Sequence, residues 1–190
     1  MKPHEMFLED RVAELVTSIR VKGALLRPLV VEASSLILLD GAHRLKALRE
    51  LGALSAPVAL VRYDRVGLKG WVRMYPKESL RDLRRVAEVS DVRELTGGPT
   101  IVTLGGGSEA YYDLVQLESL GHRLLKVVTR SSIRNLGSYL VLVIPPPPTK
   151  ELVIKAALTG RLLPPRSTRH VTEAKKVRLR TPLASLMSHG

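Results

Sequence analysis

The sequence predicts an α+β fold, and three of its features lead to this prediction. Short runs rich in Val, Ile and Leu alternate with amphipathic segments of helical period. Glycine or proline marks most junctions between these segments. Hydrophobic residues make up 45% of the 190 residues, which is enough for a packed core. Strands and helices mixed at this spacing are typical of an α+β chain.

The N-terminal half begins with a helix over 8–22, which Gly23 ends. Residues 28–33 and 35–40 are short β-rich runs that form either a tight hairpin or one interrupted strand. The pattern then predicts a helix over 42–51, strands over 57–63 and 70–75, and a helix over 78–89.

The C-terminal half continues after a break at Gly97-Gly98-Pro99. The expected elements are strands over 100–104, 123–129 and 138–144, with a helix near 109–120. Four prolines, 145–148, form an extended spacer before a helix that Thr149 caps and Gly160 ends. The glycines 105–107 lack the lysine of a P-loop, so we interpret them as a turn.

Composition excludes several classes of protein. The chain has no cysteine, which excludes disulfides and cysteine-ligated metals. It has one asparagine and one glutamine beside many Arg and Glu, a composition typical of thermophiles. No apolar run is long enough to span a membrane, and the N-terminus lacks the apolar region of a signal peptide. We therefore expect a cytoplasmic protein from a thermophile.

The charge is strongly basic and unevenly distributed. The formal net charge is +12, and residues 161–190 carry seven basic residues and one acidic residue. Such an asymmetry indicates an anionic partner, either nucleic acid, a nucleotide or a small anion, or else a solvated basic tail. Aromatic residues make up only 4%, so a stacking platform for single strands is not expected.

The junction between the run ending at Leu39 and the helix over 42–51 is a candidate anion site. The first N–H groups of a helix lack partners and carry partial positive charge. Gly41 allows close approach of a phosphate, and His43 and Arg44 lie in the first turn. Asp40 suits Mg²⁺ or an orienting role. Alternatively, Asp40 only caps the helix and the two basic side chains lie on its solvated face.

Three motifs resemble a known family. "LLDGAHRLKALRELG" resembles the D-G-x-H-R signature of the ParB/sulfiredoxin superfamily, in which this turn binds nucleotide phosphates. "KPHE" and "AALTGRLLPPRSTRHV" resemble the archaeal ADP-dependent free L-serine kinases, a branch of that superfamily. The resemblance implies a ParB/sulfiredoxin-like nucleotide-binding domain with a mixed sheet over 1–75. It also implies a smaller α/β domain over 76–190, whose block 161–172 closes over the active site.

The resemblance further implies a phosphotransferase that uses ADP and Mg²⁺ to convert L-serine into O-phosphoserine and AMP. It assigns catalysis to Glu5, Asp40 and His43, with Glu5 as the base and Asp40 also as the metal ligand. Nucleotide binding falls to Gly41, Ala42, His43 and Arg44. Without the resemblance, Glu5 would be interpreted as an ordinary terminal residue.

Substrate binding is assigned to the only tryptophan and to four residues of the C-terminal motif: Trp71, Ser167, Thr168, Arg169 and His170. Trp71 fits core packing equally well. Ala42 stands where the family usually has a second histidine, which removes one phosphate donor. The sequence begins where relatives carry a further strand, so we expect Glu5 to lie on a frayed terminus if that strand is missing.

A ParB-like protein that binds nucleotide and nucleic acid without kinase activity is the alternative, supported by the net charge. It requires a helix-turn-helix after the first domain, whereas 76–144 predicts strands and glycine loops. The sequence therefore favours the kinase, with small-molecule partners and an undetermined oligomeric state. Sulfiredoxin chemistry is excluded because it requires a cysteine.

Overall fold

The computed structural model describes residues 1–129 and 136–188, and the chain divides into two compact units. The first consists of Met1–Gly67, Val153–Pro165 and His170–Gly190, and the second of Leu68–Leu152 and Arg166–Arg169. Both combine helices with sheets, so the predicted α+β class with a mixed sheet is confirmed.

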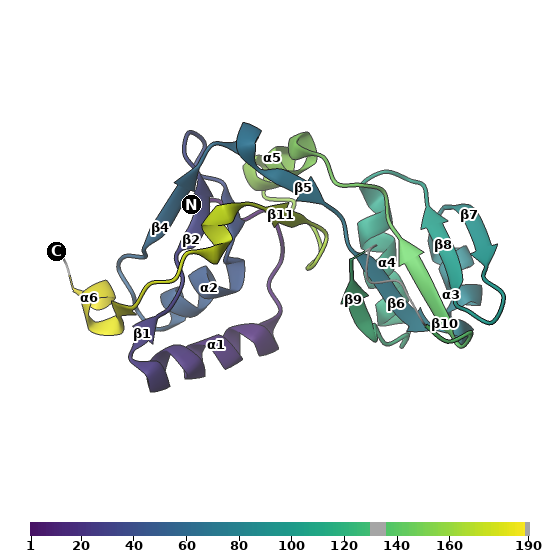
Figure 1. Ribbon diagram of the computed structural model, residues 1–190, viewed down its shortest axis with the longest axis horizontal. Helices are drawn as coiled ribbons and strands as arrows, with labels where there is room; N and C mark the ends of the chain where they lie inside the picture. The colour runs from purple at the N-terminus through teal and green to yellow at the C-terminus, as the bar shows by residue number, and fades with distance from the viewer. Residues whose placement is uncertain (130–135, 189–190) are drawn as a thin grey trace. The chain divides into compact units, whose positions relative to one another are not determined.

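The first unit contains a three-stranded sheet in the order β3-β2-β4 (Figure 1). β2 (Leu29–Glu32) is antiparallel to β3 (Leu38–Asp40) and parallel to β4 (Val58–Val61). All four residues of β2 are buried, which fits a central strand. The antiparallel pairing of β2 with β3 shows that residues 28–40 form the hairpin, not one interrupted strand.

The other elements of this unit are α1 (Glu9–Lys22), β1 (Ala24–Leu25), α2 (Ala42–Glu50), η1 (Tyr63–Arg65), α5 (Lys150–Thr159), η4 (Glu173–Lys176), β12 (Thr181–Pro182) and α6 (Leu183–Met187). β5 (Gly67–Lys69) and β11 (Arg169–Val171) form a two-stranded sheet. The predicted helix ends are confirmed: Gly23 caps α1 with a φ of 59°, and the Thr149 hydroxyl accepts the N–H of Leu152 at 3.1 Å.

The basic C-terminal segment is folded up to Ser188, so the solvated tail is a wrong interpretation of those residues. β12 pairs with β1, and the N–H of Leu183 donates to the carbonyl of Gly23 at 2.8 Å. Leu186 is only 4% exposed and packs in the same core cluster as Ile19 and Leu48. Apolar side chains such as Leu183 and Leu186, which follow the basic residues, pack into the core of the first unit and hold the segment there.

The division of the chain differs from the expected 1–75 and 76–190, because most of the C-terminal segment belongs to the first unit. Glu5 pairs with Leu163, the N–H of Leu163 donates to the carbonyl of His4, and the side chain of Leu163 is 1% exposed. The N-terminus is therefore held by backbone pairing, and the expectation that Glu5 is frayed is wrong.

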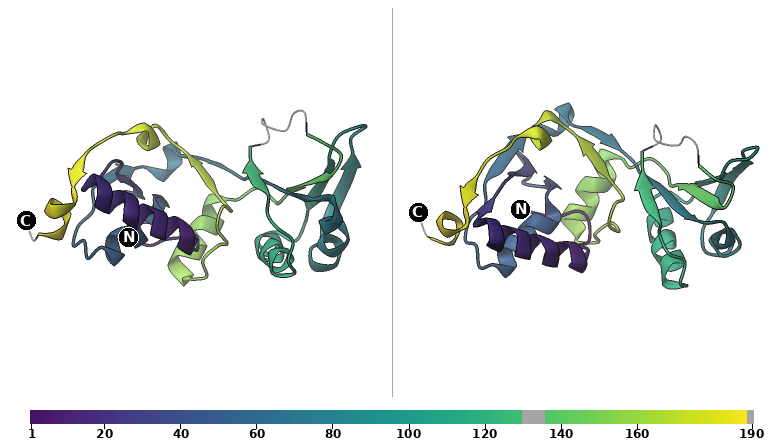
Figure 2. Two further views of the ribbon diagram at one scale, coloured as in Figure 1. Left: turned by 90° about the horizontal axis from the view of Figure 1, so that it is seen from below. Right: turned by 60° about the horizontal axis from the view of Figure 1, so that its bottom comes forward.

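The second unit is built on a five-stranded mixed sheet in the order β7-β8-β10-β6-β9. β10 runs parallel to β8 and antiparallel to β6. The core residues include Tyr75, Leu83, Leu114 and Val141, which places α3 and α4 against one face of the sheet, as Figure 2 shows. The elements are β6 (Val72–Pro76), η2 (Lys77–Ser79), α3 (Leu80–Val86), β7 (Val89–Glu94), β8 (Thr100–Leu104), α4 (Glu109–Ser119), β9 (Lys126–Val128) and β10 (Leu140–Ile144).

The expected helix over 78–89 is partly wrong, because α3 ends at Val86 and a strand begins at Val89. Residues of β7 pair with β8 in antiparallel register, with an irregularity between Val89 and Asp91. The pairing with β8 outweighs a helical pattern that local sequence alone supports.

Two hairpin strands separate α3 from α4, so these helices do not form a helix-turn-helix. Among the helices of residues 1–129 and 136–188, none has the length and apolarity needed to cross a membrane.

Candidate active site

The turn after β3 is built around Gly41. Gly41 is the N-cap of α2 and has a φ of 100°, which favours glycine. A Cβ atom at Gly41 would lie 2.7 Å from Cδ2 of Leu29 and 2.9 Å from Nη2 of Arg44. Ala42 begins the helix and packs against the core cluster around Leu29, so only its backbone is available as a donor. The turn therefore requires glycine both for its conformation and for space.

Asp40 is held between two cations. Its Oδ2 accepts a hydrogen bond of 2.5 Å from Nη2 of Arg44, and its Oδ1 lies 2.8 Å from Nζ of Lys175. No side chain caps α2, so the interpretation of Asp40 as the helix cap is wrong. Of the two roles that the sequence left open, this geometry favours an orienting acceptor over a metal ligand.

Arg44 organises the turn from inside. Nη1 donates to the carbonyl of Pro28 at 2.6 Å and to that of Arg27 at 3.2 Å. The side chain is 16% exposed, and burial is the main cause that lowers its pKa. Because the guanidinium already binds Asp40 and two carbonyls, its capacity for bidentate phosphate binding is largely occupied.

His43 connects the turn to the start of α1. Its Nε2 accepts the N–H of Leu8 at 3.0 Å, and its ring packs edge-on against Phe7 at 6.4 Å. Leu8 is the N-cap of α1 and has no side-chain cap of its own. In this arrangement Nε2 of His43 is an acceptor, so that nitrogen does not donate to a phosphate.

Two buried histidines bind consecutive carbonyls of β3, immediately before Asp40. Nδ1 of His4 donates to the carbonyl of Leu38 at 2.9 Å, and the ring of His170 donates to the carbonyl of Leu39. Nε2 of His170 lies 2.9 Å from the hydroxyl of Tyr63. The rings of His4 and His170 meet edge-on at 5.2 Å. Together they fix the strand that presents Asp40.

Both imidazoles are neutral at physiological pH. Burial lowers the pKa of His4. Burial, reinforced by His4 and Lys175, lowers the pKa of His170 to about 3. His170 is 3% exposed and uncharged, so it lacks the positive charge expected of a ligand for a substrate carboxylate. Its substrate-binding role stays a prediction, and its observed contacts hold β3.

Glu5 lies next to this histidine pair. Its Oε1 is 3.9 Å from Nε2 of His4, and its side chain is 17% exposed. The backbone on both sides is fixed, because the N–H of Met6 donates to the carbonyl of Leu163 at 2.8 Å. Glu5 therefore combines a fixed backbone with a carboxylate that is still partly accessible.

The residues present do not fit a resident Mg²⁺ ion. Within the described part of the chain, no three His, Asp or Glu side chains gather in a group able to hold a metal. Asp40, the predicted ligand, uses one oxygen for Arg44 and the other for Lys175. A hard cation needs such oxygens unpaired. Magnesium would therefore reach this site only when bound to a nucleotide.

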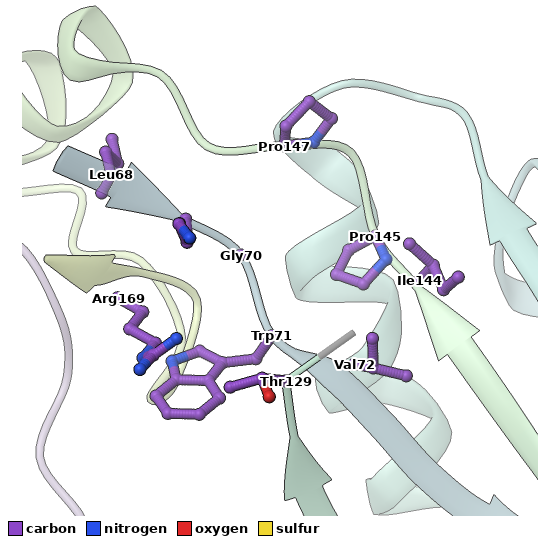
Figure 3. A pocket seen from close by; sticks show the side chains of 10 residues that line it. Leu68, Gly70, Trp71, Val72, Thr129, Ile144, Pro145, Pro147 and Arg169 are labelled. Carbon is purple, nitrogen blue, oxygen red and sulfur yellow. The ribbon is translucent and has the colours of Figure 1, made fainter. Parts of the chain in front are cut away.

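The second unit contains a pocket of about 480 Å³ beside Trp71 and Arg169 (Figure 3). Its walls come from residues 68–72, Thr129, Ile144, two prolines and Arg169. The indole Nε1 donates to the carbonyl of Thr168 at 2.9 Å, and the guanidinium of Arg169 lies 5.3 Å from the ring centre. A cation over an aromatic wall in a pocket of this size suits a small anionic ligand.

Ser167 and Thr168 are 1% and 8% exposed, respectively. Thr168 contacts Trp71 through its backbone carbonyl, so it positions the indole. Residues buried to this extent are better suited to support a pocket than to contact a ligand.

The structure brings Glu5, residues 40–44 and His170 into the first unit, and it assigns Trp71, Ser167, Thr168 and Arg169 to the second. Sequence reasoning missed His4, Tyr63 and Lys175. His4 stands inside the quoted "KPHE", which was the available signal. Lys175 follows the C-terminal motif among charges that sequence alone treats as a tail.

The first part of the chain matches a known family model. The family model "ParB N-terminal domain" matches residues 1–69. Residues 1–69 therefore resemble a ParB N-terminal domain, and the predicted resemblance to the ParB/sulfiredoxin superfamily is confirmed.

Three relatives cover most of the chain. A protein of Sulfolobus acidocaldarius named "ParB-like protein" is 29% identical over 90% of this chain and 86% of its own length. The "ATP-dependent L-serine kinase" of Staphylothermus marinus is 26% identical over 97% of this chain and 87% of its own length. The "ADP-dependent L-serine kinase SerK" of Thermococcus kodakarensis is 25% identical over 90% of this chain and 83% of its own length. The resemblance to the L-serine kinase branch is thus confirmed.

Solved structures share the fold. C-terminally truncated SbnI from Staphylococcus aureus has a TM-score of 0.80 and 20% identity, covering 97% of this chain and 85% of its own. A free serine kinase in complex with AMP has a TM-score of 0.73 and 22% identity, covering 98% and 90%. At such identities these structures show a common fold.

Proposed function

We propose that this protein is a free L-serine kinase that transfers the β-phosphate of ADP to the serine hydroxyl. The observation that carries the proposal is the cluster around Asp40. Three segments far apart in sequence converge there: the N-terminal stretch with Glu5, the turn at Asp40, and the C-terminal segment with Lys175. Two relatives along nearly the whole chain are named L-serine kinases.

In the proposed reaction, the serine oxygen attacks the β-phosphorus of ADP. The bond from that phosphorus to the bridging oxygen breaks, and AMP leaves with the electron pair. Glu5 accepts the hydroxyl proton and later releases it to solvent. The backbone of Gly41 and Ala42, with His43, binds phosphate at the start of α2. Arg44 and Asp40 keep the turn in shape.

For the amino acid, we propose the pocket at Trp71. Arg169 has the charge and geometry to bind the serine carboxylate. Thr168 keeps the indole in place through its carbonyl, and Ser167 supports the same loop from a buried position. These roles apply the predicted assignment with the correction that the buried hydroxyls act indirectly.

The phosphoryl donor must be determined by experiment, because one relative is named ATP-dependent and another ADP-dependent. Purified protein with L-serine, magnesium and either ADP or ATP should form O-phosphoserine, detected by mass spectrometry. We expect AMP as the coproduct with ADP. Absence of phosphoserine with both donors, at several temperatures and with other hydroxy amino acids, would contradict the proposal.

Glu5→Gln tests the base directly. Glutamine keeps the size of the side chain but cannot accept the proton, so kcat should fall at least about 100-fold. ADP affinity, measured by calorimetry, should stay within a few-fold because the phosphate site is unchanged. Glu9→Gln is the matched control, since Glu9 is an exposed residue in the first turn of α1 and should leave kcat unchanged.

The alternative, a ParB-like protein that binds nucleic acid without kinase activity, is tested by adding a DNA-binding measurement to the phosphoserine assay. If the protein forms no phosphoserine yet binds duplex DNA with a steep salt dependence, that alternative is the better one.

A further inference from the structure

Lys175 is positioned by the fold, not by chance on the surface. It lies in the short helix η4, whose start is capped by the Thr172 hydroxyl through the N–H of Ala174 at 3.3 Å. Its Nζ is 2.8 Å from Oδ1 of Asp40 and 3.2 Å from the carbonyl of His170. Two acceptors from different segments therefore fix the ammonium at the turn.

The neighbouring lysine behaves differently. Lys176 pairs with Glu173 at 2.7 Å, and these two side chains are 76% and 85% exposed. Lys175 is 34% exposed and faces Asp40 instead. Adjacent residues of the same type thus point to different surroundings, and the contrast identifies Lys175 as the one with a specific position.

Lys175 is also the more available of the two cations on Asp40. Arg44 is 16% exposed and donates to two backbone carbonyls as well as to the carboxylate. An ammonium has three donors, and the partners described for Lys175 account for two of them. The third can be donated to a ligand without breaking either contact.

We propose that Lys175 binds the terminal phosphate of the nucleotide, with Asp40 and the carbonyl of His170 holding its ammonium in place. This rests on the proposed function, in which the turn at Gly41 receives phosphate. One carboxylate in direct contact with two cations leaves an excess of positive charge at the turn. That excess of positive charge favours the binding of a polyphosphate. Asp40 was expected to bind a metal ion there, and Lys175 supplies a positive charge at the same place.

Lys175→Gln is the appropriate variant, because it keeps a polar side chain with N–H donors while the charge is lost. Lys176→Gln is the matched control. Binding of ADP and of adenosine to each protein is measured by calorimetry in the presence of a chelator, so that magnesium does not contribute. We expect Lys175→Gln to weaken ADP about 10- to 100-fold, the range for a hydrogen bond to a charged group, and to change adenosine less than about threefold.

Unchanged ADP affinity in Lys175→Gln overturns the inference, as does an equal loss for ADP and adenosine, which would indicate a merely structural role. Failure of the wild type to bind ADP overturns it too. If Lys175→Gln does not fold, as judged by circular dichroism, Lys175→Arg must retain ADP binding for the inference to hold. The kinase proposal fails separately: a wild type that binds ADP through Lys175 but forms no phosphoserine refutes the activity and keeps the phosphate contact.

Discussion

Replacing His170 with asparagine should reduce the acid sensitivity of the first unit. The imidazole is 3% exposed, and burial, together with the charges of neighbouring groups, lowers its pKa from 6.5 to about 3. Below pH 6.5 the unfolded chain takes up a proton that the folded chain does not. Stability is therefore highest above pH 6.5 and falls progressively as the pH approaches 3.

The magnitude follows from these two pKa values. Between pH 7.5 and 5.0, an imidazole with a pKa of 6.5 unfolded and about 3 folded lowers the free energy of unfolding by about 2 kcal/mol. Carboxylates with lowered pKa, such as Glu32, titrate mainly below this window. His4 contributes in the same direction, because burial lowers its pKa as well. Within this window the two buried histidines therefore lower stability in the same direction as the pH falls.

Guanidinium unfolding followed by circular dichroism at pH 7.5 and 5.0 measures the effect. His170→Asn should be less stable at pH 7.5, since it loses buried contacts, but its loss between the two pH values should be about 2 kcal/mol smaller than that of the wild type. Tyr63→Phe is the control, because it removes the hydroxyl partner of Nε2 without exposing the ring. It should keep most of the pH dependence. Equal pH dependence in His170→Asn and the wild type would refute the argument that a buried neutral imidazole holds β3.

Two further predictions concern the turn and the pocket. Gly41→Ala should destabilise the protein by about 1–3 kcal/mol, because Gly41 has a φ of 100°, and should weaken ADP binding, because the added Cβ would approach Leu29 to 2.7 Å. Gly23→Ala is the comparison: Gly23 has a φ of 59° and open space around it, so ADP binding should change less. Thermal unfolding measures the stability and calorimetry the ADP affinity, and equal effects of the two variants would show that space at the turn is unimportant. Arg169→Ala should raise the KM for serine about 10- to 100-fold and leave kcat within a few-fold of the wild-type value, as expected for a lost contact to a charged substrate. An unchanged KM in steady-state assays would remove the pocket at Trp71 from the proposal.

The parts of the fold predicted from sequence are those determined by local chemistry. The left-handed Gly23, the cap at Thr149 and the strand–glycine–helix turn at Gly41 each depend on residues a few positions apart. Local sequence narrowed residues 28–40 to a hairpin or one interrupted strand, and the structure shows the hairpin. The helix expected to reach residue 89 failed at the point where pairing with a distant strand decided the conformation.

The groups that hold Asp40 could not be derived in the same way. His4 reaches the carbonyl of Leu38 across 34 positions, and Tyr63 reaches His170 across 107. No local pattern distinguishes a histidine that binds a buried carbonyl from one that binds a ligand. The resemblance pointed to these segments and assigned His170 to substrate, but it could not show that the ring is buried and binds the carbonyl of Leu39.

The same limit applies to net charge, which does not identify a function by itself. The excess of basic residues after position 160 admitted a nucleic-acid surface or a solvated tail. In the folded chain these cations have separate local roles. Lys175 faces Asp40, Lys176 pairs with Glu173 on the surface, and Arg180 donates to the carbonyl of Lys22 at 3.2 Å. A nucleic-acid footprint is a set of cations on one face, whereas Lys175 contacts a carboxylate beside the Gly41 turn, where we propose that phosphate binds. The position of a single lysine therefore carries more functional information than the total charge.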